Sequence, residues 1–308
     1  MWSSGKRADF QFVKNVRLEG NIIFNSGSPS GLLRDNVIVA SNDNNGINIA
    51  QNITLLNNIL YHNTHNENGK RNGEAPSLTF GYTKKAPIKD VTANGNIIVG
   101  GHNVLRLSIA ESLNFNNNIV YGAVQIGPNT SDYLKNWNFD TNTYYSKLKT
   151  PFRISRGEKY NLKAWQQAFQ LDENSKVLNS SDFNLNNTLH ISKHRLNENK
   201  FNLALFNADG NDVPVDFSKH NLKAGVEYKI YDVENSIVVV KSGQLPEDFK
   251  VMFPMQLTAF ERPHHNTLAQ KTESSFGVFV IEFEAQKTDQ VSIEKDNFFK
   301  RFFKWLGF

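Results

Sequence analysis

Cysteine is absent from the 308 residues of the chain, and methionine occurs only three times. Without cysteine there is no disulfide framework and no thiol redox chemistry. No apolar run is long enough to cross a membrane, and Met1 to Arg7 contain no apolar core of a signal peptide. Charged residues make up 21% of the chain, so the composition indicates neither a disordered nor a membrane-embedded protein.

Motifs of the common enzyme classes are absent as well. The sequence contains no nucleophilic triad, phosphate-binding loop or redox motif. Glycoside hydrolysis needs two facing carboxylates, and no paired-aspartate motif is present. His62 and His65 have a spacing that suits a metal only weakly, and no third ligand accompanies them. We therefore expect no metal site and no cofactor. Calcium stays open as a ligand, although the sequence shows no ligand cluster for it.

The charge is distributed unevenly along the chain. Residues 1–160 contain 17 Lys and Arg against 11 Asp and Glu, a net charge of +6. Residues 161–308 contain 17 against 19, a net charge of −2. The first half is therefore the better candidate for an anionic partner. Its cations are not clustered as in a nucleic-acid-binding patch, so we do not expect DNA or RNA as the partner.

Asparagine, by contrast, makes up more than a tenth of the chain and recurs in one motif. Two alternating apolar positions lead into a polar turn with Asn, and a short Ile or Val strand follows. The recurring step near 22 residues predicts a solenoid of stacked parallel strands, and a step of 38 predicts a coil with an insertion. The second Asn of each copy is Asn21, Asn36, Asn58, Asn96, Asn118 or Asn142.

If these copies stack, two arrangements of side chains are expected. The isoleucines Ile59, Ile97 and Ile119 should lie above one another inside the column, with Asn58, Asn96 and Asn118 stacked at the same turn. Each coil also carries a further short strand whose middle residue is flanked by apolar residues. Because side chains alternate along a strand, these middle residues should share one exposed face. They are Asn48, Thr79, Arg106 and Gln125.

On these motifs, the chain resembles the pectate-lyase-like superfamily of right-handed parallel β-helices, especially bacterial secreted proteins of unassigned substrate. The segment from Trp165 to Val177 looks like the one that closes the solenoid in those proteins. The resemblance covers about residues 10–180. It implies a secreted, periplasmic or cell-surface location and activity on polysaccharide. The superfamily spans lyases, hydrolases, epimerases and inert scaffolds, so the fold alone does not choose among them.

The resulting prediction is an all-β chain. Residues 1–180 form a right-handed parallel β-helix, closed by a capping helix near 161–171 in which Asn161 is the N-cap. Residues 196–285 contain five or more short strands separated by turn signals and predict a small antiparallel β-sandwich. This region is similar to sandwiches appended to carbohydrate-active enzymes. No comparable cap is visible before Phe10, so we expect an incomplete N-terminus and a fragment of a longer protein.

The last residues, 286–308, read as a polar linker followed by a short cationic amphipathic segment at 298–306. As a helix, this segment would have Phe298, Phe299, Phe302 and Phe303 on one stripe and basic residues on another. Three hypotheses stay open for it. It could dock onto the body of the protein, lie on an anionic membrane surface, or extend without structure.

A candidate active site follows from the insertion between His62 and about Lys89, beside the outward Arg106. Elimination of a uronate needs a cation to neutralise the carboxylate and a base to remove the adjacent proton. Arg106 could clamp the carboxylate, and a His or Lys could act as the base. The catalytic candidates are Arg106, His102, His65 and Lys70. The substrate-binding candidates are Asn48, Thr79, Gln125, His62, Glu67, Arg71, Glu74 and Lys84.

Three hypotheses for function remain. The first is a polysaccharide lyase or related enzyme acting on an acidic glycan, with a glycoside hydrolase less favoured. The second is a non-catalytic glycan-binding β-helix. The third is a structural or adhesive solenoid in which the Asn ladders only stabilise the fold. The expected partner is an anionic polysaccharide.

Overall fold

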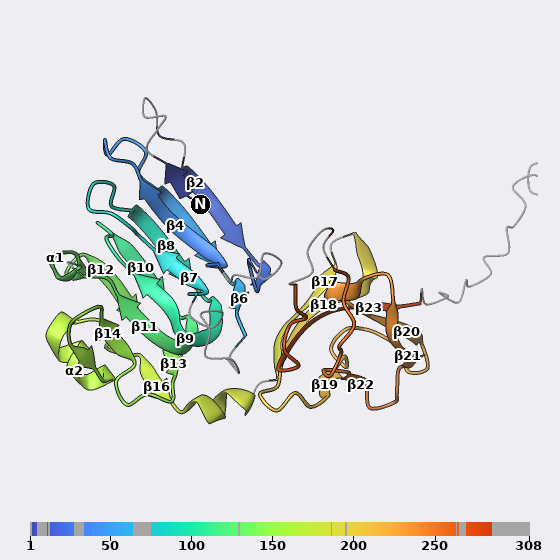
Figure 1. Cartoon of the computed structure of the whole chain (residues 1–308). Coiled ribbons are helices and arrows are strands. Elements are labelled where there is room, and N and C mark those ends of the chain that lie inside the picture. The colour runs from blue at the N-terminus through green and yellow to red at the C-terminus, as the bar shows by residue number, and fades with distance from the viewer. Residues whose placement is uncertain are drawn as a thin grey trace, which may run out of the picture.

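The computed structural model describes residues 2–4, 11, 13–27, 34–63, 75–128, 130–185, 187–194, 196–262, 264 and 269–284. The fold is all-β and combines a curled parallel sheet with antiparallel sheets (Figure 1). The predicted linker and cationic segment at 286–308 lie outside the described residues, as do His65, Glu67, Lys70, Arg71 and Glu74.

Five parallel strands form one flank of the first half. They pair in the spatial order β12-β10-β8-β5-β2. Alternation along each strand turns one set of side chains inward, and Ile53, Val91 and Leu113, which are neighbours in this register, are buried. The strands are β2 (Lys14–Glu19), β5 (Gln51–Leu56), β8 (Lys89–Asn94), β10 (Leu113–Asn116) and β12 (Trp137–Asp140).

The second sheet is curled, and its longest strand pairs with two different strands. The first part of β9 (Ile97–Leu107) pairs with β6, and its last part pairs with β7. β11 (Ile119–Ile126) runs beside it and has an irregular register between Tyr121 and Val124. The other strands of this sheet are β1 (Trp2–Ser4), β3 (Ile22–Phe24), β4 (Val37–Asn42), β6 (Ile59–Tyr61), β7 (Leu78–Phe80), β13 (Thr143–Tyr145), β14 (Phe152–Ile154), β15 (Lys159–Tyr160) and β16 (Lys176–Leu178).

A ladder of asparagine side chains joins successive strands where the chain passes from the first sheet to the second. In each step the Nδ2 of one residue donates to the Oδ1 of the next, for example from Asn58 to Asn96 at 2.9 Å. The same Oδ1 also accepts the backbone N–H of the preceding member. The five members are Asn21, Asn58, Asn96, Asn118 and Asn142.

The residue before each ladder Asn adopts a left-handed backbone, which explains the paired turn residues of the motif. Asn57 has φ 51° and Gly95 has φ 66°. Asn and Gly tolerate this region, so the turn can place the following Asn side chain against the next Asn of the ladder. The predicted stacking of Asn58, Asn96 and Asn118 is confirmed.

Asn36 is not a member of the ladder, so the predicted copy at that position is wrong. Its Nδ2 donates to the Tyr61 carbonyl at 2.8 Å, and the strand after it, β4, pairs with β7. Residues 35–38 therefore belong to the curled sheet and do not start a new coil. The true step from Asn21 to Asn58 is 37 residues.

The predicted isoleucine stack exists, but its expected place inside the column is wrong. Ile59 pairs with Ile97, and Ile97 with Ile119, in one register. The neighbours Leu60 and Ile98 turn into the core instead. The isoleucines face outward and contact the antiparallel half of the chain. Alternation fixes which residues share a face, but it does not say which face is inside.

Helix α2 (Leu162–Phe169) covers one end of the parallel core. The Asn161 side chain accepts from Ala164 N at 2.9 Å and caps the helix. Trp165 is fully buried and stacks on Phe152, with ring centroids 5.1 Å apart. A short helix, α1 (Ser131–Leu134), lies on the same half of the molecule (Figure 1).

The antiparallel half has one five-stranded sheet in the order β17-β18-β23-β20-β21 and the two-stranded pair β19-β22. Phe201, Ile230, Phe253 and Ile281 are among the residues of its own core. Its elements are β17 (Thr188–His194), β18 (Asn197–Phe206), β19 (Val213–Asp216), β20 (Glu227–Asp232), η4 (Val233–Asn235), β21 (Val239–Gln244), β22 (Lys250–Phe253) and β23 (Phe276–Phe283). The short helix η3 (Ser180–Leu185) leads into this half and contacts β11 and β13 of the curled sheet.

A third apolar cluster joins the two halves. Tyr61 stacks on Phe276, with centroids 3.9 Å apart and planes at 9°, and its hydroxyl lies 3.1 Å from Ser275 Oγ. Asn25 Nδ2 donates to Thr272 Oγ1 at 2.9 Å. Burial of the outward isoleucines and these polar contacts hold the antiparallel half against the curled sheet.

Candidate functional site

The outward side of the curled sheet carries one row of polar and cationic residues. Thr79 pairs with Arg106, Arg106 with Gln125, and Gln125 with Arg153, all in parallel register. Lys159 extends the row, since β15 pairs antiparallel with β14 and sets it opposite Arg153. The predicted alignment of Thr79, Arg106 and Gln125 is confirmed. We call Arg106, Gln125, Arg153 and Lys159 the cationic row.

Alternation explains why these long polar side chains face outward. On either side of Arg106, Leu105 and Leu107 are fully buried in the core. Phe152, beside Arg153, is also buried and touches Trp165. Each apolar pair holds its strand in place, so the polar residue between must point away from the core. The row is thus built on rigid strands and not on loops.

Hydrogen bonds order the middle of the cationic row. Arg106 Nε donates to Gln125 Oε1 at 3.4 Å, and Arg153 Nη2 donates to Asn103 Oδ1. Arg153 Nε is buried and has no hydrogen-bond partner among the described residues. Burial lowers the pKa of Arg153 below its usual range, but a guanidinium remains charged at neutral pH.

The row carries three cations and no carboxylate. Adjacent strands lie about 4.8 Å apart, so Arg106 and Arg153 are separated by about 10 Å, with Gln125 between them. Glu158 precedes Lys159 and accepts a hydrogen bond from the Tyr160 hydroxyl at 2.7 Å. The arrangement therefore suits a ligand with negative groups spaced along the stacking direction of the strands.

Two predicted members of the exposed face are not accessible. Asn48 lies in a bend, is fully buried, and donates its backbone N–H to Asp43 Oδ2 at 2.7 Å. The predicted strand around it is wrong, because β4 ends at Asn42 and Ile38 occupies the equivalent position beside Thr79. Thr79 is in the row but only 3% exposed. A ligand can therefore reach the row from Arg106 onward.

His62 is also buried, which corrects its expected place on an accessible loop. It is 1% exposed, and its Nε2 lies 2.8 Å from the Arg34 carbonyl oxygen. Burial lowers the pKa of His62 to about 4, although the carbonyl oxygens of Arg34 and Pro76 favour the protonated ring. The neutral ring joins two chain segments and does not reach the cationic row as a base.

The remaining candidates fall in three groups. Lys84 is exposed in the turn that precedes β8 and is not in the row. His102 lies in β9, and its side chain is outside the described part of the structure. His65, Glu67, Lys70, Arg71 and Glu74 stay predictions.

Sequence reasoning missed Arg153 and Lys159. The signal for Arg153 was available, since Phe152-Arg153-Ile154 repeats the apolar-cation-apolar pattern of Leu105-Arg106-Leu107. This copy of the pattern lies outside the Asn motif. Lys159 joins through an antiparallel pair that the repeat does not contain, so no periodicity pointed to it.

Asp172 is a fully buried carboxylate of the parallel half and has a structural role. It accepts from Asn142 Nδ2 at 2.9 Å, Trp165 Nε1 at 3.0 Å and Ser175 Oγ at 2.6 Å. Its burial raises the pKa of Asp172. An ionised carboxylate accepts hydrogen bonds but donates none. Asp172 therefore accepts the hydrogen bond from Asn142, the last member of the Asn ladder, and the ladder ends there.

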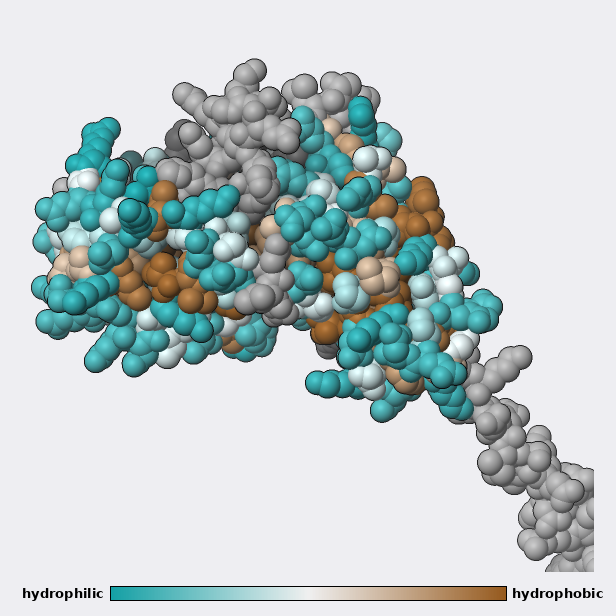
Figure 2. All heavy atoms as spheres, turned by 90° about the horizontal axis from the view of Figure 1, so that it is seen from below, coloured by the Kyte–Doolittle hydropathy of each residue, from teal (hydrophilic) through white to brown (hydrophobic). Residues whose placement is uncertain are grey.

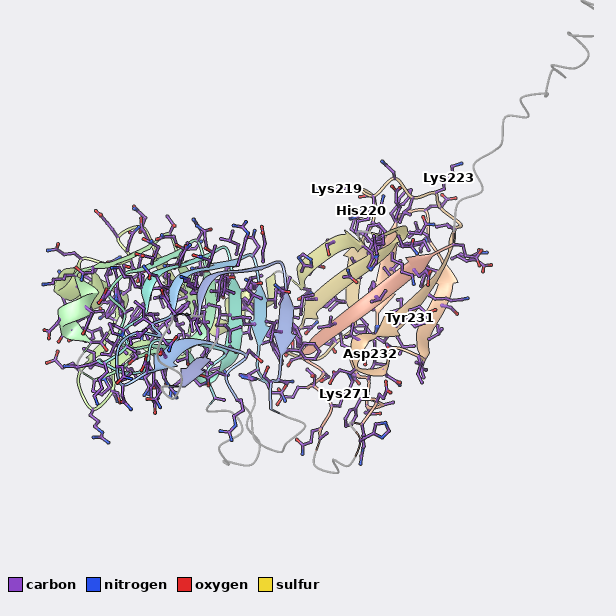
Figure 3. All side chains as sticks on the ribbon, turned by 90° about the horizontal axis from the view of Figure 1, so that it is seen from above. Lys219, His220, Lys223, Tyr231, Asp232 and Lys271 are labelled. Atoms are coloured by element: carbon purple, nitrogen blue, oxygen red, sulfur yellow. The ribbon has the colours of Figure 1, made fainter. Side chains whose placement is uncertain are left out.

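Figure 3 labels two groups of charged residues on the antiparallel half. Lys219, His220 and Lys223 lie together at one end, away from Asp232 and Lys271 (Figure 3). Lys271 Nζ bonds Asp232 Oδ2 at 2.7 Å, and both side chains are largely buried. The face in Figure 2 is mostly hydrophilic, with smaller hydrophobic patches on both halves.

Within the described ranges, no three His, Asp or Glu residues are grouped so that they could hold a metal ion. Among the same residues, no helix has the length and apolar character needed to cross a membrane. In comparisons with family models, curated proteins and solved structures, the chain matches none of them. The cationic row is the feature of the described residues that best indicates a function.

Proposed function

We propose that this protein binds an acidic polysaccharide along the cationic row. The observation that carries the proposal is the register that places Arg106, Gln125 and Arg153 on consecutive strands, with Lys159 beside them. A sugar ring is about as long as the spacing between strands, so an extended uronan would offer one sugar per strand. Carboxylates on alternate sugars would then meet Arg106 and Arg153, and Gln125 would bond the hydroxyls between them.

We also propose that the parallel strands belong to a closed right-handed β-helix of the pectate-lyase-like type. Support comes from strands that pair in parallel at separations of 22 and 24 residues and from the unbroken Asn ladder. The outer face of such a column is a natural site for a long polymer. Polymers of this kind occur at and beyond cell surfaces, so the proposal includes an extracellular or periplasmic location.

Cleavage by β-elimination is the reaction that the row could assist. An arginine that neutralises the uronate carboxylate makes the C5 proton more acidic. A base must then take that proton while the C4–O bond breaks and a double bond forms between C4 and C5. The departing oxygen keeps the electron pair of the broken bond and takes a proton from water. Lys159 lies beside Arg153 and is exposed, which makes it the described residue best placed to approach the sugar. We propose lyase activity as the finer form of this function.

Binding to polygalacturonate, alginate and hyaluronan tests the proposal, with dextran as the uncharged control. We expect binding that weakens as NaCl rises, and Arg106→Ala and Arg153→Ala should each weaken it about tenfold. Lys223→Ala removes an exposed cation from the other half and should leave binding unchanged. Equal affinity of all three variants would contradict the cationic row as the binding site.

The same mixtures distinguish cleavage from binding. A lyase releases an unsaturated uronate, which absorbs ultraviolet light, and Lys159→Ala should remove that absorbance even at polymer concentrations that saturate its binding. Binding without a rise in absorbance for any polymer would refute the lyase proposal and leave the binding proposal intact.

A further inference from the structure

A cleft of about 740 Å³ opens between the parallel and antiparallel halves. On one side it is lined by Phe24 and the turn that follows, residues 25–27. On the other side lie residues of loops in the antiparallel half, including Glu234, Phe260 and Gln270. The volume is typical of a small-ligand site, and junctions between domains are a common place for such sites.

The walls of this cleft are held in place by bonds to one segment, residues 271–276. Asn25 Nδ2 donates to Thr272 Oγ1, and the ring of Phe24 lies 5.8 Å from that of Phe276. On the opposite wall, the Glu234 carboxylate accepts from Thr272 N at 3.2 Å and from Lys271 Nζ. Both walls are therefore bonded to the same segment, residues 271–276, which leads into β23. We infer that the cleft is formed before any ligand binds.

The chemistry of the lining is amphipathic. Phe24 and Phe260 supply aromatic rings, and the Arg262 guanidinium carbon lies 5.6 Å from the centre of the Phe260 ring. Ser26, Glu261 and Gln270 supply polar groups around these rings. A pyranose ring has the matching character, since its C–H faces are apolar and its hydroxyls point to the rim.

The charge of the lining selects among sugars. The lining contains two carboxylates, Glu234 and Glu261, and one arginine, Arg262. Glu234 is engaged by Lys271, whereas Glu261 is exposed and can accept from hydroxyls. The cleft thus lacks the positive excess of the cationic row, and a uronate would meet a carboxylate there.

We propose that this cleft is a second binding site, which takes a neutral sugar unit. The inference rests on the proposed function in that the ligand is carbohydrate, but the cleft shares no residue with the cationic row. Phe260 would stack on the sugar face, and Glu261 and Gln270 would bond its hydroxyls.

Calorimetric titration of the full chain with cellotetraose, mannotetraose and tetragalacturonate tests this. We expect a neutral tetrasaccharide to bind with an affinity unaffected by 0.5 M NaCl. Phe260→Ala should weaken it about tenfold, whereas Phe260→Tyr should keep most of it. Tyr82→Ala removes an exposed ring from the parallel half and is the matched control. Phe260 is only partly buried and belongs to none of the apolar cores, so we expect these variants to fold.

The outcomes separate the two proposals. Loss of tetragalacturonate binding in Arg106→Ala, with neutral binding kept, supports two independent sites. If neither neutral tetrasaccharide binds, or if Phe260→Ala leaves their binding unchanged, the cleft proposal fails. The proposal for the cationic row is still supported in that case if tetragalacturonate binds in a salt-dependent manner. If no acidic sugar binds but the binding of a neutral tetrasaccharide depends on Phe260, the proposal for the cationic row is refuted and the proposal for the cleft is supported.

Discussion

His62 shows how one buried side chain can make stability depend on pH. The ring is held neutral at 1% exposure, and its pKa is lowered to about 4, against 6.5 in an unfolded chain. Between these two values the unfolded state binds more protons than the folded state. Stability is therefore fully present above pH 6.5 and is lost as the pH falls toward 4.

We expect this difference to reduce the free energy of unfolding by up to about 3 kcal/mol between pH 7 and pH 4. Urea unfolding of the native chain and of His62→Asn across this range measures it. The variant should be less stable at pH 7 but should depend less on pH. NMR titration gives an independent check, since a His62 ring that titrates near 6.5 in the folded protein would contradict the prediction.

At the scale of the element, the Asn ladder is the feature that holds successive parallel strands in register. Asn96 donates to Asn118 Oδ1 and to the Leu55 carbonyl, and its own Oδ1 accepts from Asn58. All of these groups are buried, so removing one amide leaves several polar atoms without partners.

Asn96→Ala should therefore lower the free energy of unfolding by about 3 kcal/mol. Asn114→Ala is the matched control, since Asn114 is exposed on the neighbouring strand β10 and should cost less than about 0.5 kcal/mol. Thermal and urea unfolding compare the two variants. Similar losses for both would mean that the ladder contributes nothing beyond ordinary asparagine turns.

At the scale of the whole molecule, the antiparallel half is fastened by the outward side chains of the curled sheet. Tyr61, Ile59 and Val99 are nearly or completely buried against Phe276, Ala204 and their neighbours. Phe276→Ala removes the ring that stacks on Tyr61 and should destabilise the junction by about 3–5 kcal/mol.

We expect calorimetry of Phe276→Ala to show two separate unfolding transitions, because each half keeps its own apolar core. Phe260→Ala serves as the control, since Phe260 lies outside the interface cluster and should keep the native transition. A single transition at an unchanged temperature in Phe276→Ala would show that the junction does not couple the two halves.

The sequence by itself determined the all-β character, the stacked Asn58, Asn96 and Asn118, and the alignment of Thr79, Arg106 and Gln125. These features follow from the local alternation of apolar and polar residues and from turns that Asn and Gly favour. Both depend only on residues that are close together in the sequence. The outward direction of Arg106 followed from Leu105 and Leu107 for the same reason.

Only the tertiary structure decided which of these residues solvent can reach. Thr79 and Ile59 face away from the core but are buried, and Asn48 is enclosed by the Asp43 turn. Arg153 and Lys159 join the cationic row through strand pairs between distant segments, which no local pattern encodes. Burial depends on what other parts of the chain cover, and that is settled only when the chain has folded onto itself.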